Sequence, residues 1–285
     1  NDELILGAKS GADYMLSIKS DNFHILDEVD SYPILIPQNG DIKSLYECID
    51  KCLEMGRIFI ADPILDPINY GFTDSILRYK ELRDRYPDIH IMMGTGNVTE
   101  LTHADTTGIT MTLMGIISEL KINHILTTEV SNHCKSVVKE NDIARRIILA
   151  AHDNNTTPKH IDSALLTTHD ADSFKYSTDE IRELADNVRD KNYRIMISED
   201  GVHIFNKNGI KIAIDPFDLY ESIDVEGDIG HAFYLGIELA RAQIAYQLGK
   251  DYEQDEELKW GCLVDQEIDD KLSFKKTGST YKKKK

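Results

Sequence analysis

The sequence predicts an α/β protein in which a parallel β-sheet with its helices is followed by a small α+β domain. Over residues 1–152, short apolar runs alternate with segments of helical periodicity, as in a series of β/α units. Over residues 177–285, three short runs are separated by Asp-Gly and Asn-Gly turns, which indicate an antiparallel meander. The polar stretch 153–176 has little periodicity, and we interpret it as a linker between two domains.

The first domain contains five predicted strands, each followed by a polar break. They lie at residues 12–18, 32–37, 57–61, 89–93 and 124–128. An eight-stranded β/α barrel needs about 250 residues, so two alternatives remain. Either the sheet is open, or these are the last five strands of a barrel whose first three lie upstream of Asn1. The second is favoured, because the chain does not begin with Met and its first unit has no earlier strand.

The helices of the first domain have readable ends. Asp41 is expected to cap a helix that ends at Gly56, and the next helix is expected to start at Thr73 or Asp74 and to end before Pro87. Two more helices are expected at 107–120 and 137–152. In the second domain we expect a helix at 177–190, strands at 194–198, 202–205 and 210–214, a short helix at 216–223, and a long helix at 228–248.

Composition excludes several classes of protein. The chain has 50 acidic and 32 basic residues and a net charge of −18, which argues against binding to nucleic acid. A basic tail that ends at Lys285 is interpreted as a solvated terminus. No apolar run reaches about 18 residues, so no membrane span or membrane partner is expected. The N-terminus lacks the pattern of a signal peptide and the four cysteines do not form a disulfide framework, so a cytoplasmic location is expected.

Metal binding is not predicted. Cys48 and Cys52 are four residues apart on an amphipathic helix, and no second pair of ligands lies near them, so packing is the expected role. The other candidate ligands are single histidines that have no partner close in sequence.

Two consecutive strands end in polar residues suited to ligand binding. The run 57–61 breaks at Asp62, which precedes a proline, and the run 89–93 breaks at a Gly-Thr-Gly motif followed by Asn97. The carboxyl ends of parallel strands meet at one edge of a sheet, where β/α proteins bind ligands. The alternative is structural: Asp62 as a turn residue, and Asn97 as a helix cap or a left-handed turn residue.

The first domain resembles the pterin-binding family that includes dihydropteroate synthase and the corrinoid-dependent methyltransferases. It resembles more closely the archaeal proteins called dihydropteroate synthase-related. The motifs that carry the resemblance are Phe59-Ile60-Ala61-Asp62-Pro63, Met93-Gly94-Thr95-Gly96-Asn97-Val98 and Leu126-Thr127-Thr128-Glu129-Val130. The resemblance implies a TIM barrel of which strands four to eight are present. It also implies that the Asp62 carboxylate accepts hydrogen bonds from a ring N–H and the amino group of a pterin, and that Asn97 addresses the ring nitrogen that carries a methyl group.

The sequence departs from the synthases at three places. Asn97 and Val98 stand where synthases carry basic residues, Thr128 and Glu129 replace an anion-binding Arg-x-His, and Ser17 replaces an Asn or Asp. The resemblance therefore implies a reduced pterin, tetrahydromethanopterin or a precursor, as the cofactor of a methyltransferase in one-carbon metabolism. Asn97 would be catalytic, and the ligand would contact Asp62, Asn97, Ser17, Thr128 and Glu129. The alternatives are a dihydropteroate synthase-like enzyme of methanopterin biosynthesis and a non-catalytic pterin-binding or partner-docking module.

The long helix of the second domain resembles a small domain of unknown role in the same archaeal proteins. Its small and apolar side chains form a stripe suited to close packing, at Ala232, Leu235, Leu239, Ala242 and Ala245. His231, at the start of the helix, is interpreted as a capping or surface residue. A role as a ligand to corrinoid cobalt has no other support in the sequence, and a homodimer or a corrinoid protein partner stays open.

Overall fold

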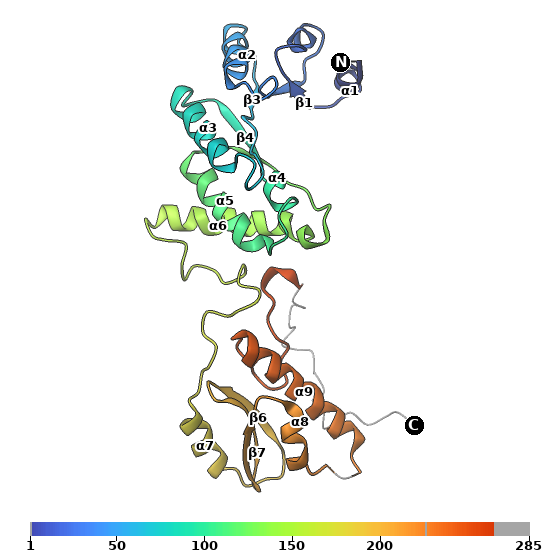
Figure 1. Cartoon of the computed structure of the whole chain (residues 1–285), viewed down its shortest axis with the longest axis vertical. Helices are drawn as coiled ribbons and strands as arrows, with labels where there is room; N and C mark the ends of the chain where they lie inside the picture. Colours follow the sequence, from blue (N-terminus) through green and yellow to red (C-terminus); the bar gives the residue numbers. More distant parts are fainter. Residues whose placement is uncertain (1, 226, 265–285) are drawn as a thin grey trace. The chain divides into compact units, whose positions relative to one another are not determined.

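A computed structural model describes residues 2–225 and 227–264. The chain divides into two compact units, residues 1–162 and residues from Ser163 on, and each is described by itself (Figure 1). The basic tail predicted from the sequence lies outside the described residues. Among the helices of the described ranges, none has the length and apolar character needed to cross a membrane.

The first unit is built of five strands that alternate with helices, as the sequence predicts. Its strands are β1 (Tyr14–Ile18), β2 (Tyr32–Leu35), β3 (Ile60–Ala61), β4 (His90–Gly94) and β5 (His124–Leu126). Its helices are α1 (Asp2–Lys9), α2 (Ile42–Glu54), α3 (Phe72–Arg85), α4 (Gly96–Thr99), α5 (Thr106–Glu119) and α6 (Val137–Asp153). The connection between β1 and β2 contains a short 3-10 helix, Phe23–Asp27.

Helix ends follow the local chemistry of the sequence, with one correction. Asp41 caps α2 as predicted, and its side chain accepts a hydrogen bond from the backbone N–H of Lys43. The expected start of α3 at Thr73 or Asp74 is wrong, because Gly71 is the N-cap. Gly71 has a φ of 106°, a left-handed conformation that glycine adopts without strain, so the helix begins earlier than the polar residues indicate.

The five strands form one parallel sheet in sequence order, β1-β2-β3-β4-β5. One face of the sheet is buried along its length, through the side chains of Met15, Ile18, Leu35, Ala61, Ile91 and Met93. On the other face, Ile34, Ile60 and Met92 form a small buried cluster. Because the strands are parallel and consecutive, right-handed crossovers place the connecting helices on a single face and bring all the strand ends to one edge. Cys48 and Cys52 are buried on α2, which confirms their packing role.

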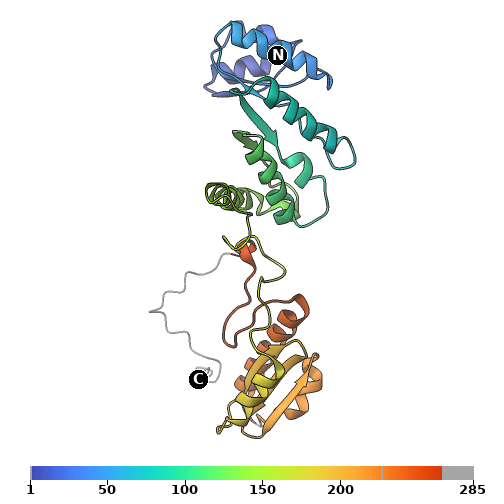
Figure 2. The same cartoon turned by 90° about the vertical axis from the view of Figure 1, so that its left-hand side faces the viewer.

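The second unit contains a three-stranded antiparallel sheet with helices on both faces (Figures 1 and 2). Its elements are α7 (Thr178–Asp186), β6 (Arg194–Ser198), β7 (Gly201–Asn206), β8 (Gly209–Ala213), α8 (Pro216–Leu219) and α9 (Ile229–Leu248). The meander predicted from the Asp-Gly and Asn-Gly turns is confirmed. Ser177 caps α7 in a capping box with Glu180, and Gly249 ends α9 in a left-handed conformation.

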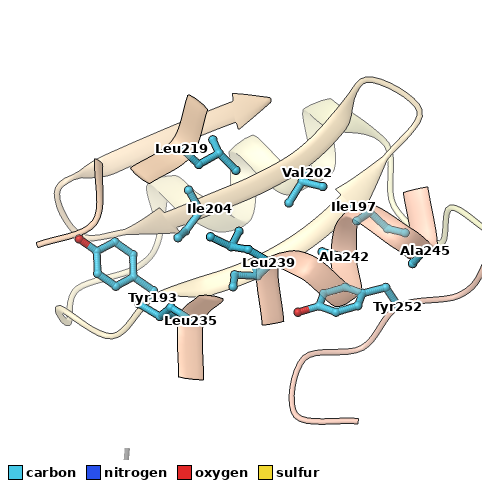
Figure 3. Packing of buried hydrophobic residues seen from close by; sticks show 11 residues of the cluster. Tyr193, Ile197, Val202, Ile204, Leu219, Leu235, Leu239, Ala242, Ala245 and Tyr252 are labelled. Atoms are coloured by element: carbon cyan, nitrogen blue, oxygen red, sulfur yellow. The ribbon is translucent and has the colours of Figure 1, made fainter. Parts of the chain in front are cut away.

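Alternate residues of β6 and β7 face either α9 or α7. Ile195, Ile197, Val202 and Ile204 pack with α9, and Phe205 packs with α7. Figure 3 shows the larger cluster, in which Leu235, Leu239, Ala242 and Ala245 of α9 lie against the sheet. The predicted stripe is therefore confirmed at four positions. At Ala232 it is wrong, because that residue is exposed in the first turn of the helix.

Residues 163–176 contain no helix or strand, and they are assigned to the second unit. They pack near the end of α9, where the fully buried Lys250 donates hydrogen bonds to the carbonyls of Thr167 (2.9 Å) and Thr168 (3.3 Å). Its ammonium nitrogen also lies 4.8 Å from the centre of the Trp260 ring. A buried ammonium group thus anchors this irregular segment.

Candidate functional site

The structure brings Asp62 and Asn97 to the same edge of the sheet, through the loop that follows β3. Asp62 comes directly after β3, and its backbone N–H donates to the carbonyl of Leu35 at the end of β2 (2.8 Å). Asn97 lies in the first turn of α4, just after β4, and its side-chain amide donates to the carbonyl of Leu65 (2.8 Å). The loop therefore connects the two predicted site residues.

Asp62 is a buried carboxylate that accepts hydrogen bonds from the described residues through one of its two oxygens. It is 8% exposed. Oδ1 accepts two hydrogen bonds, from the hydroxyl of Tyr79 and from the backbone N–H of Ile64, both 2.8 Å long. Within the described ranges no hydrogen bond reaches Oδ2. Burial raises the pKa of the Asp62 carboxyl, and the hydrogen bond from Tyr79 is the strongest influence that lowers it.

The contact with Ile64 confirms the turn role of Asp62, because a side-chain oxygen that accepts from the N–H two residues later forms an Asx turn. The corresponding structural interpretation of Asn97 is wrong. Thr95 is the N-cap of α4, and Asn97 lies inside the helix without a left-handed backbone. Asn97 is exposed. Besides the N–H that donates to Leu65, its side-chain amide has a second N–H and an oxygen that can form hydrogen bonds.

Thr128 and Glu129 follow β5 at the same edge, and both are engaged by the protein. The hydroxyl of Thr128 donates to Glu100 (2.8 Å), and a Cβ on Gly96 would approach that hydroxyl to 3.1 Å. The loop after β5 therefore lies against the glycine turn before Asn97. Glu129 accepts a hydrogen bond from the backbone N–H of Val138 (3.0 Å), which directs its carboxylate to the first turn of α6.

Glu100 holds this loop and was not singled out in the sequence. Its carboxylate accepts from the backbone N–H groups of Val130 (2.9 Å) and Ser131 (2.8 Å) besides Thr128. These hydrogen bonds lower the pKa of Glu100 to about 2, and the bond from Val130 has the largest effect. No sequence signal points to it, because an acidic residue at the end of a short helix is ordinarily a solvated one.

Ser17 lies at the end of β1, two strands from β3 in the sheet. Its carbonyl accepts a hydrogen bond from the side chain of Asn22 (3.2 Å). Within the described ranges no hydrogen bond joins Ser17 to Asp62 or Asn97. The structure thus places Asp62, Asn97, Thr128 and Ser17 at one edge of the sheet, with Asn97 bonded to the loop that follows Asp62 and Thr128 next to Gly96.

A hollow of about 370 Å³ lies elsewhere, at the opposite edge of the sheet. It is lined by Asp30, Tyr32, Met55, Gly56, Arg57 and Ile58, which come at or before the starts of β2 and β3. None of the predicted site residues contributes to it.

Two histidines that are far apart in the sequence, His90 and His124, lie side by side in the structure. Nδ1 of His90 lies 2.9 Å from Nε2 of His124 on the neighbouring strand. In the part of the chain that the structure describes, no three His, Cys, Asp or Glu side chains gather as a metal site. His231 donates its backbone N–H to Asp228, the N-cap of α9, and its ring lies 6.1 Å from that of Tyr234. The interpretation of His231 as a capping residue is therefore wrong, because Asp228 is the cap, and the ring contact with Tyr234 agrees with the alternative of a surface contact.

Comparison with known proteins adds one relationship. No family model matches the sequence. The chain is similar to an uncharacterized protein of Methanocaldococcus jannaschii, with 32% identity over 90% of this chain. The match covers 56% of that relative, so the chain spans little more than half of its length.

Proposed function

We propose that this chain is part of a pterin-binding TIM-barrel protein of the dihydropteroate synthase-related group. The observation that carries the proposal is the buried Asp62 carboxylate, whose Oδ2 accepts no hydrogen bond from the described residues and which lies at the edge where parallel sheets bind ligands. Oδ2 retains its lone pairs for donors of a ligand. A ring N–H and an adjacent amino group, as in a pterin, offer such donors side by side, and a charged acceptor strengthens both bonds.

The barrel part of the proposal is supported by the sheet face that is not fully covered. The register places Leu16, Ile34 and Ile60 on this face, and Tyr14 precedes Leu16 by two residues on the same strand. Ile34 and Ile60 are buried, whereas Tyr14 and Leu16 are 52% and 53% exposed. All-parallel sheets are ordinarily covered on both faces. If these strands are the fourth to eighth of a barrel, this face is the barrel interior and further strands would cover it.

Work at the ring nitrogen is favoured over condensation by the charges around the site. The guanidinium that acts on the Asp62 carboxyl is that of Arg78, which donates to the carbonyl of Ile64 (2.8 Å) and pairs with Asp66 (2.7 Å). It is therefore occupied by the loop rather than ready to hold a pyrophosphate. The exposed amide of Asn97 keeps an N–H that can donate to a nitrogen as a methyl group leaves. We propose a cytoplasmic pterin-dependent methyltransferase that uses a reduced pterin such as tetrahydromethanopterin.

A binding experiment tests the proposal. Calorimetry should show that the full-length protein binds tetrahydromethanopterin. Asp62→Asn should weaken this binding by about 10- to 100-fold, because a hydrogen bond to a charged group contributes about 1.5–3 kcal/mol. Asp74→Asn, an exposed carboxylate in the first turn of α3, is the matched control and should bind as the wild type does. A folded wild-type protein that binds no reduced pterin would refute the proposal.

A comparison of pterin with lumazine tests the hydrogen bonds proposed for Asp62. Lumazine carries a carbonyl where pterin carries its amino group, so it places an acceptor against the Asp62 carboxylate. We expect the wild type to prefer pterin to lumazine and Asp62→Asn to lose that preference. Equal binding of the two ligands by the wild type would exclude Asp62 as the ring anchor. Product formation from a pterin pyrophosphate and an arylamine would favour the synthase-like alternative instead.

A further inference from the structure

Tyr79 is the largest fully buried side chain of the first unit, and its hydroxyl lies 2.8 Å from Asp62 Oδ1. It belongs to none of the motifs that carry the resemblance. We infer that Tyr79 is a positioning residue of the candidate site, which holds Asp62 by Oδ1 so that Oδ2 is left as the oxygen that faces a ligand. The inference rests on the proposed pterin site, but the contact it describes can be measured without a ligand.

The geometry assigns a different task to each carboxylate oxygen. Oδ1 accepts from Tyr79 and from the backbone N–H of Ile64, which occupies its two lone pairs. The two donors come from different elements, α3 and the loop after β3, so the carboxyl group cannot rotate without breaking one of the bonds. No hydrogen bond from the described residues reaches Oδ2, so its lone pairs can accept from a ligand. A ligand that brings two adjacent N–H donors therefore meets an acceptor that is already oriented.

Tyr79 also acts on the protonation of Asp62, against the larger effect of burial. Burial favours the neutral carboxylic acid, whereas the hydroxyl of Tyr79 favours the carboxylate by donating to it. Arg78, the neighbouring residue of α3, acts in the same direction as Tyr79 but more weakly, and it is paired with Asp66. Within the described ranges, Tyr79 and Arg78 are the titratable groups that act on this carboxyl. Burial and Asp62 keep the pKa of Tyr79 well above its ordinary value, so Tyr79 stays a donor at every pH of interest.

The test is a titration of Asp62 in three proteins: wild type, Tyr79→Phe and Tyr86→Phe. Carboxyl-carbon NMR follows the Asp62 resonance, which is assigned by its loss in Asp62→Asn. Tyr79→Phe should raise the pKa of Asp62, because it removes the donor to the carboxylate and keeps the ring. Tyr86→Phe is the matched control, because its hydroxyl donates to a different carboxylate, that of Asp50 (2.7 Å). It should leave the Asp62 titration unchanged.

The same variants are then titrated with tetrahydromethanopterin over a range of pH. Tyr79→Phe should weaken binding by about 2- to 10-fold at neutral pH, as expected for one lost hydrogen bond. Its loss of binding on the acid side should move to higher pH together with the pKa of Asp62. A merely structural role for Tyr79 would lower the fraction of folded protein and leave this pH profile in place.

The two proposals fail in distinguishable ways. A shifted Asp62 pKa in Tyr79→Phe without pterin binding by any protein would support the positioning role and refute the pterin site. An unchanged Asp62 pKa in folded Tyr79→Phe would overturn the inference. If Tyr79→Phe does not fold, a fluorinated tyrosine incorporated throughout the chain replaces it. That more acidic hydroxyl is a stronger donor and should lower the pKa of Asp62, and a pKa that stays the same or rises would overturn the inference.

Discussion

Replacing Lys250 by methionine should destabilise the second unit, because methionine keeps the apolar stem and removes a buried ammonium group. That group donates to the carbonyls of Thr167 and Thr168, lies 3.9 Å from a carboxylate oxygen of Asp170, and contacts the ring of Trp260. The substitution leaves two carbonyls without their donor in a segment that has no helix or strand to satisfy them.

The magnitude follows from these contacts. Each hydrogen bond to a charged group contributes about 1.5–3 kcal/mol, and a cation–π contact that is shielded from water adds about 2 kcal/mol. The ammonium group is fully buried, so desolvation offsets several kcal/mol of this gain. We therefore expect Lys250→Met to lower the free energy of unfolding by about 2–4 kcal/mol.

The assay is urea unfolding followed by the fluorescence of Trp260, the single tryptophan of the chain, which reports on the second unit. With a urea dependence of about 1–3 kcal/mol per molar, this loss should lower the midpoint by about 0.7–4 M. Lys259→Met, an exposed lysine next to the same tryptophan, is the control and should change stability by less than about 0.5 kcal/mol. A midpoint in Lys250→Met equal to or above that of the wild type would refute the reasoning.

Two further predictions concern the first unit. Burial and the neighbouring His90 lower the pKa of His124, so the unfolded chain binds a proton there more readily. The stability linked to His124 is therefore present above its ordinary pKa and is lost as the pH falls from there through the lowered pKa of the folded protein. Imidazole NMR should show that His90→Ala moves the pKa of His124 upward. Arg83 donates to five backbone carbonyls around the ends of α3 and α5. Arg83→Lys should lower the free energy of unfolding, measured by thermal denaturation, by about 1–3 kcal/mol, because an ammonium group cannot reproduce the planar array of donors. The control Arg85→Lys, at an exposed position, should change it little.

The order and type of the elements could be predicted because their signals are local. A cap such as Asp41, a capping box at Ser177 and an Asn-Gly turn each involve residues only a few positions apart. The start of α3 was misplaced for the same reason: Gly71 acts through its backbone conformation, whereas Asp74 has the side chain that resembles a cap. Local chemistry therefore places elements well and places their ends less well.

The candidate site was predicted in part. The position of Asp62 and Asn97 at one edge of the sheet could be predicted, because each comes just after a strand and the ends of parallel strands share an edge. Tyr79 and Glu100 were not predicted as site residues. Tyr79 reads as one more apolar position of an amphipathic helix, and the partner of its hydroxyl is 17 residues away. The partners of Glu100 lie about thirty residues away, in the loop after β5.

By itself the sequence determined the alternation of strands and helices, the antiparallel meander and the polar residues at the strand ends. These depend on side-chain periodicity and turn chemistry over a few residues. Only the tertiary structure decided that Asp62 is buried, that Tyr79 binds one of its oxygens, and that His90 meets His124. Burial and hydrogen bonding between distant segments depend on how the elements pack, and that packing sets the charge and orientation of the carboxylate on which the proposed function rests.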